Sequence, residues 1–225
     1  MAIKFHSAVI GLSVLFSPAQ VLASEGTRAG LARQIAKMVK IDQEIRGQVI
    51  KESAVPGSKE LPALIHRLES IDRDNTNQMR QIIKTYGWPT VKLVGKKGAN
   101  DAWLLVQHAD QNPKFQRECL DLMQPLVAQG EVGKQNFAYL TDRVLLAEGK
   151  KQLYGTQFTK GANGDWEPRP LEDPDNVDKR RLEMGLNTMA EYRKMIEEMY
   201  GKKPPLSQIG NRKSEIALIV NPNPQ

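Results

Sequence analysis

The fold is decided by residues 28–86, which read RAGLARQIAKMVKIDQEIRGQVIKESAVPGSKELPALIHRLESIDRDNTNQMRQIIKTY. Apolar residues recur every three or four positions on either side of a central Pro-Gly-Ser at 56–58. That spacing is typical of one buried face on an α-helix, and Pro and Gly favour a turn between two such helices. The sequence therefore predicts long helices over residues 28–53 and 59–86 that fold back on each other as an antiparallel pair.

The chain after this helix pair is predicted to continue mainly as helices. Apolar spacing and Pro or Gly boundaries predict four of them, over residues 101–111, 113–129, 135–148 and 177–184. A capping box from Thr188 to Glu191 opens a last one. Residues 91–94 are expected to be extended, and residues 96–98 are expected to form a loop.

One small β-hairpin is expected within this helical sequence. Residues 153–158 have the pattern of a strand, Asn163-Gly164 is a turn signal, and residues 166–171 contain the prolines typical of an edge strand. The sequence therefore predicts a mainly α, single multi-helix domain with a small β-hairpin insertion near residues 153–171.

Residues 1–23 have the pattern of a secretory signal peptide. Lys4 supplies a positive charge before the apolar run of residues 8–16, which is too short to span a bilayer. We therefore expect a periplasmic or secreted protein with no transmembrane helix once the signal peptide is removed. The rest of the chain divides into the helical domain, residues 24–200, and a basic C-terminal tail, residues 201–225.

The charge of the chain is mildly positive. Its 32 Lys and Arg residues exceed its 26 Asp and Glu residues and are interspersed among them. A nucleic-acid-binding protein typically gathers its basic residues on one face, so we expect no nucleic-acid partner. A small polar or anionic ligand is compatible with this charge. Neither a cofactor nor an oligomeric state follows from the sequence.

Cysteine and histidine are too scarce for several common sites. Cys119 is the only cysteine, so no disulfide can form within the chain. Its helical surroundings favour a buried, inert thiol, with a reactive nucleophile as the alternative. The sequence has no nucleophile elbow, no His-Glu-x-x-His motif and no phosphate loop. We expect no zinc site, whereas carboxylates could hold a hard cation.

Polar residues interrupt the apolar faces of the two long helices. Asp42 stands at a core position of the first helix and Asn75 at a core position of the second, and buried polar groups must be paired. Counted from the turn at residue 56, the axial positions of Asp42 and Asp72 differ by about 3 Å, and those of Asp42 and Asn75 by about 7 Å. We therefore expect these side chains to meet at one level of the pair, with Arg46 beside the carboxylates.

The predicted central helix ends in polar residues after an apolar run. Gln107 and His108 follow that run, and His108 shares a helical face with Leu104 and Leu105. A half-buried imidazole there can be a general base, a proton donor or a ligand. The alternative is a core histidine held by a structural hydrogen bond.

Two further groups of polar residues stand in apolar surroundings. Asp142 and Arg143 lie inside an apolar helix, which suggests buried ion pairing, although Arg143 could instead clamp an anionic group of a ligand. Tyr154, Thr156 and Gln157 have strand-like spacing. They either line a pocket wall or form the ordinary contacts of a hairpin.

The polar motifs of the chain occur in the following order: Asp42-Gln43-Glu44-Ile45-Arg46, Asp72 with Asn75, Gly87-Trp88-Pro89, Ala102-Trp103, Gln107-His108-Ala109-Asp110, Ala138 to Arg143, Gln152, Tyr154-Gly155-Thr156-Gln157, and Arg180-Arg181. In these motifs, from about Ile41 to Tyr192, the chain resembles an uncharacterised bacterial family that carries a domain of unknown function. The resemblance implies no established activity, but it does imply that these polar residues form one set.

Three functions are compatible with this set of residues. The first is an exported hydrolase of a small polar or envelope-derived substrate, with His108 as general acid or base and Asp42 or Asp142 orienting it. In that case an activated water is the nucleophile. The residues expected to bind the substrate are Arg46, Asn75, Gln107, Arg143, Tyr154, Thr156 and Gln157. The second function is non-catalytic binding of a small anion or sugar, and the third is an envelope interaction module whose polar residues only fix the fold.

Overall fold

The computed structural model of the chain describes residues 18–161 and 165–200. In chain order its elements are α1 (Pro18–Ser53), α2 (Leu61–Tyr86), α3 (Val91–Gln107), α4 (Pro113–Val127), α5 (Lys134–Ala147), β1 (Phe158–Lys160), β2 (Trp166–Pro168), the short 3-10 helix η1 (Pro174–Asn176), α6 (Val177–Glu183) and α7 (Met189–Tyr200). Within these residues the fold is mainly helical with one small two-stranded sheet, which confirms the predicted fold class.

Some of the predicted features lie outside the described residues. These are the signal-peptide pattern up to residue 17, the turn signal at residues 163–164 and the basic tail at residues 201–225. Residues 18–23, the end of the predicted signal peptide, form the start of α1. None of the described helices has the length and apolar character that crossing a membrane requires.

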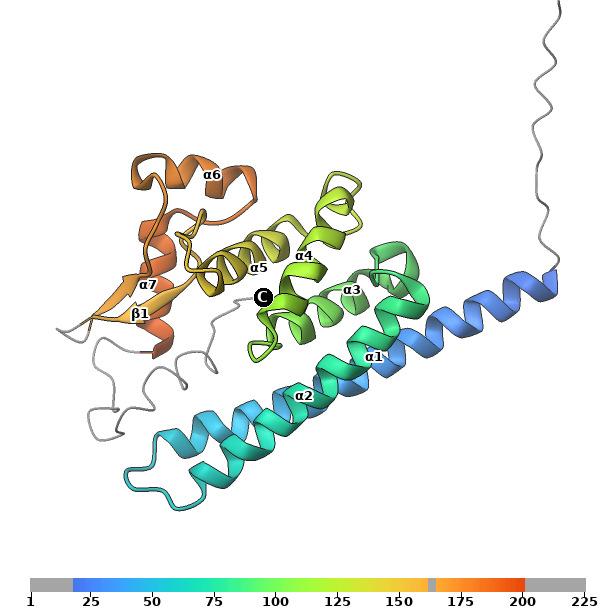
Figure 1. The fold of residues 1–225 in the computed structure, drawn as a ribbon, viewed down its shortest axis with the longest axis horizontal. Coiled ribbons are helices and arrows are strands. Elements are labelled where there is room, and N and C mark those ends of the chain that lie inside the picture. Colours follow the sequence, from blue (N-terminus) through green and yellow to red (C-terminus); the bar gives the residue numbers. More distant parts are fainter. Residues whose placement is uncertain (1–17, 162–164, 201–225) are drawn as a thin grey trace, which may run out of the picture.

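The two longest helices form the predicted antiparallel hairpin (Figure 1). α1 runs to Ser53, a turn with Gly57 at a φ of 69° follows, and α2 begins at Leu61. The Ser58 hydroxyl accepts hydrogen bonds from the amides of Glu60 and Leu61 at 3.2 Å, so the turn satisfies the first amides of α2. α3 packs against both helices of the hairpin, and α4 packs against α3 and α5.

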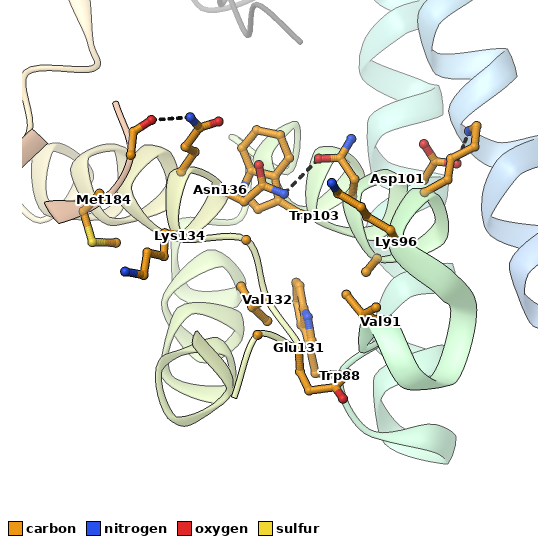
Figure 2. Close-up of a pocket in the computed structure, with 17 residues that line it drawn as sticks. Trp88, Val91, Lys96, Asp101, Trp103, Glu131, Val132, Lys134, Asn136 and Met184 are labelled. Carbon is orange, nitrogen blue, oxygen red and sulfur yellow. Dashed lines mark hydrogen bonds and ion pairs between the residues drawn. The ribbon is translucent and has the colours of Figure 1, made fainter. Parts of the chain in front are cut away.

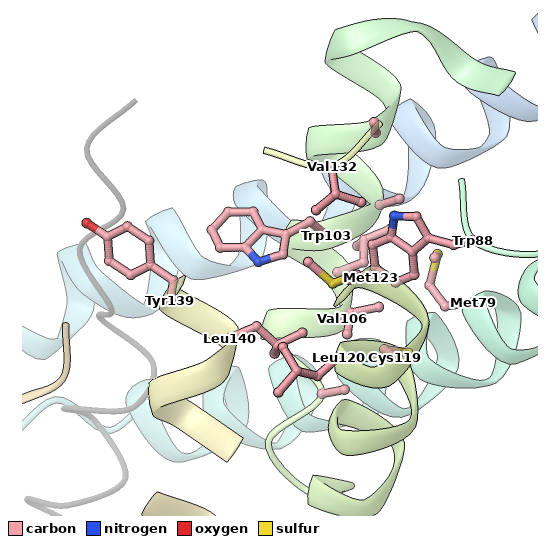
Figure 3. Packing of buried hydrophobic residues seen from close by; sticks show 14 of the residues in the cluster. Met79, Trp88, Trp103, Val106, Cys119, Leu120, Met123, Val132, Tyr139 and Leu140 are labelled. Atoms are coloured by element: carbon pink, nitrogen blue, oxygen red, sulfur yellow. The ribbon is translucent and has the colours of Figure 1, made fainter. Parts of the chain in front are cut away.

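Two separate apolar clusters stabilise the hairpin. The larger cluster joins α1, α2 and α3 to α4, α5 and α7, and it includes Trp103, whose ring centroid lies 6.2 Å from that of Tyr139 (Figure 3). The smaller cluster joins the ends of α1 and α2 near the turn through Ile45, Val49, Leu61, Ile65 and Leu68. Cys119 is fully buried in the larger cluster, and burial raises the pKa of its thiol, as an inert cysteine requires.

The segment after α2 differs from the prediction. Residues 91–98, predicted as an extended stretch and a loop, are helical and belong to α3. The side-chain oxygen of Thr90 caps this helix, and Gly95 interrupts it with a φ of 76° and a ψ of 166°. A Cβ atom on Gly98 would lie 2.9 Å from the Cβ of Val94, so glycine allows the turns on either side of the interruption to pack closely. The sequence shows the glycines but not that helix resumes after them.

The prediction of a strand over residues 153–158 is wrong for all of these residues except Phe158. β1 begins only at Phe158 and pairs antiparallel with β2, whereas residues 153–157 form a loop. Three backbone amides of this loop donate to the carboxylate of Asp142 and are therefore not available to a partner strand. Gly155, at a φ of 64°, turns the chain between them.

Candidate functional site

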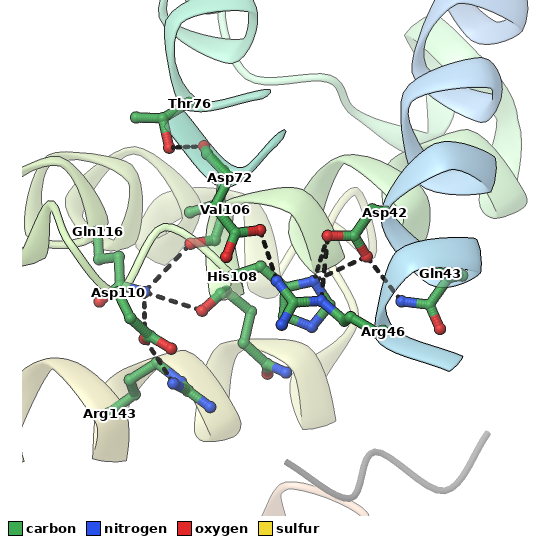
Figure 4. A network of polar contacts seen from close by, with 11 residues as sticks. Asp42, Gln43, Arg46, Asp72, Thr76, Val106, His108, Asp110, Gln116 and Arg143 are labelled. Atoms are coloured by element: carbon green, nitrogen blue, oxygen red, sulfur yellow. Dashed lines mark hydrogen bonds and ion pairs between the residues drawn. The ribbon is translucent and has the colours of Figure 1, made fainter. Parts of the chain in front are cut away.

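A layer of polar side chains separates the two apolar clusters of the hairpin. It is centred on Arg46 of α1, whose Nε lies 3.1 Å from Oδ1 of Asp42 and whose Nη2 lies 2.6 Å from Oδ1 of Asp72 (Figure 4). One guanidinium thus bridges a carboxylate from each helix. The structure brings Asp42 and Asp72 to one level, as the residue count from the turn predicts, with Arg46 beside them. Within the described residues the Asn75 side chain makes no hydrogen bond to this group. We refer to Asp42, Arg46, Asp72 and His108 as the polar layer.

His108 reaches Asp42 from the end of α3. Its Nδ1 lies 3.0 Å from both carboxylate oxygens of Asp42, and Gln43 donates to Oδ2 of the same carboxylate at 2.7 Å. α3 ends at Gln107 rather than at residue 111, which makes His108 the residue that terminates the helix. Within the described residues no group hydrogen-bonds the other ring nitrogen, Nε2.

Burial and neighbouring charges set the protonation states of this pair. Burial raises the pKa of Asp42, but His108 and Arg46 outweigh that effect and lower it to about 2. Burial and the charge of Arg46 lower the pKa of His108 below its ordinary value, although Asp42 opposes this. At neutral pH, therefore, Asp42 is a carboxylate and His108 is a neutral imidazole that donates its Nδ1 hydrogen to it. The lone pair then lies on Nε2, where a general base needs it.

Asp72 is the second carboxylate on a single guanidinium. Burial and the charge of Asp42 raise the pKa of Asp72 to about 7, although Arg46 opposes the rise. One cation cannot neutralise two buried carboxylates, so the second retains its proton to a higher pH. Asp72 is therefore the member of the polar layer that exchanges a proton around neutrality, and its side chain is 15% exposed whereas that of Asp42 is fully buried.

A second polar cluster adjoins His108. Nη1 of Arg143, on α5, lies 2.5 Å from Oδ1 of Asp110. Gln116, on α4, donates to the same oxygen at 3.2 Å and to the backbone carbonyl of Gln107 at 2.9 Å. Because Asp110 follows His108 by two residues, this cluster and the polar layer meet where α3 ends (Figure 4). The Asp110 side chain is 30% exposed, which opens this end of the site to solvent.

Three of the predicted substrate-binding residues carry buried polar atoms that have no hydrogen-bond partner within the described residues. These atoms are Nδ2 of Asn75, Nε2 and Oε1 of Gln107, and Nε of Arg143. Buried polar groups are normally paired with protein, water or ligand. Gln107 precedes His108 directly, and Arg143 holds Asp110 beside it. Of the five such atoms in the described residues, the three of Gln107 and Arg143 therefore belong to residues next to His108 or its neighbour Asp110. The other two are Nδ2 of Asn75 and Nε1 of Trp103.

Asp142 binds the loop after α5 rather than His108. Its oxygens accept hydrogen bonds from the amides of Leu153, Tyr154 and Thr156 and from the Thr156 hydroxyl, at 2.7 to 2.9 Å. Gln157 in turn donates to that hydroxyl at 3.1 Å. The predicted pocket-wall residues of this loop are therefore arranged around Asp142. The contacts are those of a structural anchor that shapes the loop.

Asp142 and Arg143 do not pair with each other, contrary to the expectation from their adjacency. Consecutive residues of an α-helix point about 100° apart. Arg143 accordingly pairs with Asp110, while Asp142 faces the loop. Of the two carboxylates considered as orienting groups, only Asp42 contacts His108.

Sequence reasoning missed three buried or half-buried polar residues. Gln116 lies between buried Phe115 and Cys119, and the criterion that singled out Asn75 would have found it. Asp110 was visible only as part of a motif. Arg181, which is 1% exposed and was likewise named only in a motif, donates to the Tyr154 carbonyl at 2.5 Å, a contact that no local pattern indicates.

Neither His66 nor a metal-ligand cluster adds to the site within the described residues. The side chain of His66 is exposed and contacts only Glu69, at 3.5 Å, among the described residues. Within the part of the chain that the structure describes, no group of three or more His, Cys, Asp or Glu side chains is arranged to hold a metal ion.

Comparison with protein families matches residues 29–204 to a family of unknown function, DUF6624. The match confirms the resemblance seen in the order of the polar motifs. No curated protein and no solved structure matches the chain.

Proposed function

We propose that this chain, which belongs to the family of unknown function DUF6624, is a hydrolase in which His108 activates a water molecule. The contact between Nδ1 of His108 and the Asp42 carboxylate at 3.0 Å carries the proposal. It fixes the imidazole in the tautomer that leaves Nε2 free to accept a proton, as in other histidine bases held by a carboxylate. The signal-peptide pattern of residues 1–23 supports export to the periplasm or beyond the cell.

The proposed reaction needs no protein nucleophile. Nε2 of His108 takes a proton from water while the water oxygen bonds to the electrophilic carbon or phosphorus of the substrate. The imidazolium that results is stabilised by the Asp42 carboxylate and returns the proton to the leaving group as its bond breaks. General acid–base catalysis of this kind typically contributes about 10²–10⁴ in rate.

A small polar substrate would approach His108 from the more exposed edge of the site. The side chains of Asp72 and Asp110 are more exposed than those of His108 and Arg143. We therefore propose that the substrate reaches His108 from the side of these two carboxylates. Arg143 has one guanidinium nitrogen on Asp110 and an Nε that has no partner within the described residues, so it can also hold an anionic group of the substrate.

Turnover of chromogenic compounds tests the hydrolase. The full chain would be assayed with p-nitrophenyl esters, phosphates, phosphodiesters and glycosides, alongside the variants His108→Gln and His66→Gln. We expect at least one class to be hydrolysed, with the rate reduced about a hundredfold or more in His108→Gln and unchanged in His66→Gln. Equal turnover by the wild type and His108→Gln would exclude His108 as the base.

Non-catalytic binding is the second candidate, and the unpartnered atoms of Gln107, Asn75 and Arg143 favour it. A bound sugar or small anion would supply both donors and acceptors for these groups. If the chain only binds its ligand, binding should be saturable and no product should form. The variant Gln107→Leu should then bind the ligand more weakly while its melting temperature stays near that of the wild type. If no ligand binds and the variants of the polar layer only lower the melting temperature, the layer serves the fold alone.

A further inference from the structure

A cavity of about 930 Å³ lies apart from the His108 site (Figure 2). It is enclosed by the start of α3, the loop before α5 and the residues that follow α6, and no member of the polar layer lines it. Small-molecule sites typically have volumes of about 300–1,000 Å³ and combine an apolar lining with a few polar groups. The cavity therefore has the size of a ligand site.

The cavity has a buried aromatic and aliphatic surface. Trp88, Trp103 and Val132 line it, and each is at most 5% exposed. In the view of Figure 2, Trp88 and Val132 lie below Lys96 and Lys134. Indole rings favour flat apolar groups, so a planar body is the ligand shape that this surface fits.

Lysines on opposite sides of the cavity give it a positive rim. Lys96 makes no ion pair or hydrogen bond within the described residues, and Lys134 reaches only the Glu183 carbonyl, at 3.4 Å. The third lysine, Lys97, is neutralised by Asp101 at 2.5 Å. Two ammonium groups therefore remain available to an anion. The carboxylate of Glu131, which accepts the Lys92 amide at 2.7 Å, also lines the cavity, so the five charged lining residues leave one net positive charge.

The start of α5 adds backbone donors to this rim. Among the described residues no side chain caps the helix at Gly133, and the residues of its first turn, Lys134 to Asn136, line the cavity. Nδ2 of Asn136 donates to Oδ1 of Asn100 at 2.9 Å. An uncapped helix start presents free N–H groups and the positive end of the helix dipole, which together favour an anion.

We infer that this cavity binds a small organic anion with a flat apolar body. Its carboxylate or phosphate lies between Lys96 and Lys134 at the start of α5, and its body lies against Trp88 and Val132. The inference does not depend on the function of His108.

Calorimetric titration of the full chain with phenyl phosphate and benzoate tests the inference. Inorganic phosphate, which lacks the apolar body, and benzyl alcohol, which lacks the charge, are the matched compounds. We expect the aryl anions to bind with a dissociation constant in the micromolar to millimolar range, and both matched compounds to bind at least about tenfold more weakly. Failure of both aryl anions to bind at about 10 mM would overturn the inference.

Variants then assign the binding to this cavity. Both lysines are exposed, so the double variant Lys96→Gln/Lys134→Gln is expected to fold, and we expect it to weaken binding of phenyl phosphate about tenfold or more. Lys92→Gln changes an exposed lysine of the same helix that does not line the cavity, and it is expected to leave the binding unchanged. Undiminished binding by the double variant, at an unchanged melting temperature, would contradict the assignment.

Discussion

Asp42 and His108 are 66 residues apart in the chain, yet Nδ1 of His108 lies 3.0 Å from each oxygen of the Asp42 carboxylate. The same carboxylate accepts from Arg46 and Gln43, so it is the acceptor on which the polar layer converges. On the buried face of α1, Asp42 lies between Met38 of the larger apolar cluster and Ile45 of the smaller one, where an apolar side chain would otherwise be expected. The proposed chemistry and the register of the hairpin therefore depend on one residue.

Removal of the Asp42 carboxylate is expected to be strongly destabilising. In Asp42→Ala two buried donors, Nε of Arg46 and Nδ1 of His108, lose their acceptor, and each buried donor left unpaired typically costs about 1–3 kcal/mol. The free energy of unfolding, measured by urea denaturation, should fall by that order. Asp74→Asn, at an exposed position of α2, is the control and should change it little. A loss below about 1 kcal/mol in Asp42→Ala would show that the layer does not hold the hairpin.

Asp72→Asn is expected to become relatively more stable as the pH rises. The pKa of Asp72 is about 7 in the folded protein against an ordinary 3.8, so the folded state binds the extra proton between these values. The wild type therefore loses stability as the pH rises from about 4 to 7, whereas the asparagine does not titrate.

Urea denaturation at pH 5 and pH 8 measures this effect. The difference in unfolding free energy, variant minus wild type, should increase by about 2–3 kcal/mol between the two pH values. Asp74→Asn should show no such increase. A difference that is the same at both pH values would mean that Asp72 is already ionised at pH 5.

Substitution of Asp142 is expected to destabilise the loop of residues 153–157, whose amides donate hydrogen bonds to its carboxylate. In Asp142→Ala, the amides of Leu153, Tyr154 and Thr156 lose their acceptor. Asp142→Asn should be almost as damaging, because its amide nitrogen would face donors. Hydrogen exchange of these three amides should accelerate in both variants, while exchange in α1 and α2 stays near that of the wild type. Unchanged protection of the loop would refute the anchoring role.

The smaller apolar cluster is expected to stabilise the turn end of the hairpin. Leu68→Ala removes a side chain that is 2% exposed and should cost about 2–5 kcal/mol of unfolding free energy. Leu182→Ala, at a position that is 77% exposed, is the matched control and should cost less than about 0.5 kcal/mol. Similar losses in the two variants, measured by thermal or urea unfolding, would argue against a separate cluster at that end.

The hairpin and its polar layer could be predicted because they depend on regular geometry. Helical rise and one recognisable turn fix which residues of α1 and α2 lie at the same level, so Asp42 and Asp72 could be matched by counting. The contact of His108 with Asp42 could not be predicted, because it depends on where α3 ends and on how α3 packs against the hairpin.

The other parts depend on interactions that no local pattern encodes. Residues 153–157 look like a strand, but their amides bind a side chain from a preceding helix. Gly95 looks like a helix breaker, yet Thr90 and Gly98 allow a helix on both sides of it. The cavity combines Trp88, Lys134 and Met184, which are distant in sequence and share no motif.

The protonation state of His108 tests the central claim most directly. Nitrogen-15 NMR of the imidazole across a pH titration reports both the tautomer and the pKa, and His108→Gln assigns the signals. We predict a neutral ring protonated on Nδ1 at pH 7, with a pKa below its ordinary 6.5 because burial and Arg46 disfavour the charged form. A ring protonated on Nε2, or one still charged at pH 7, would contradict the account, because neither leaves a lone pair on Nε2 for a water molecule.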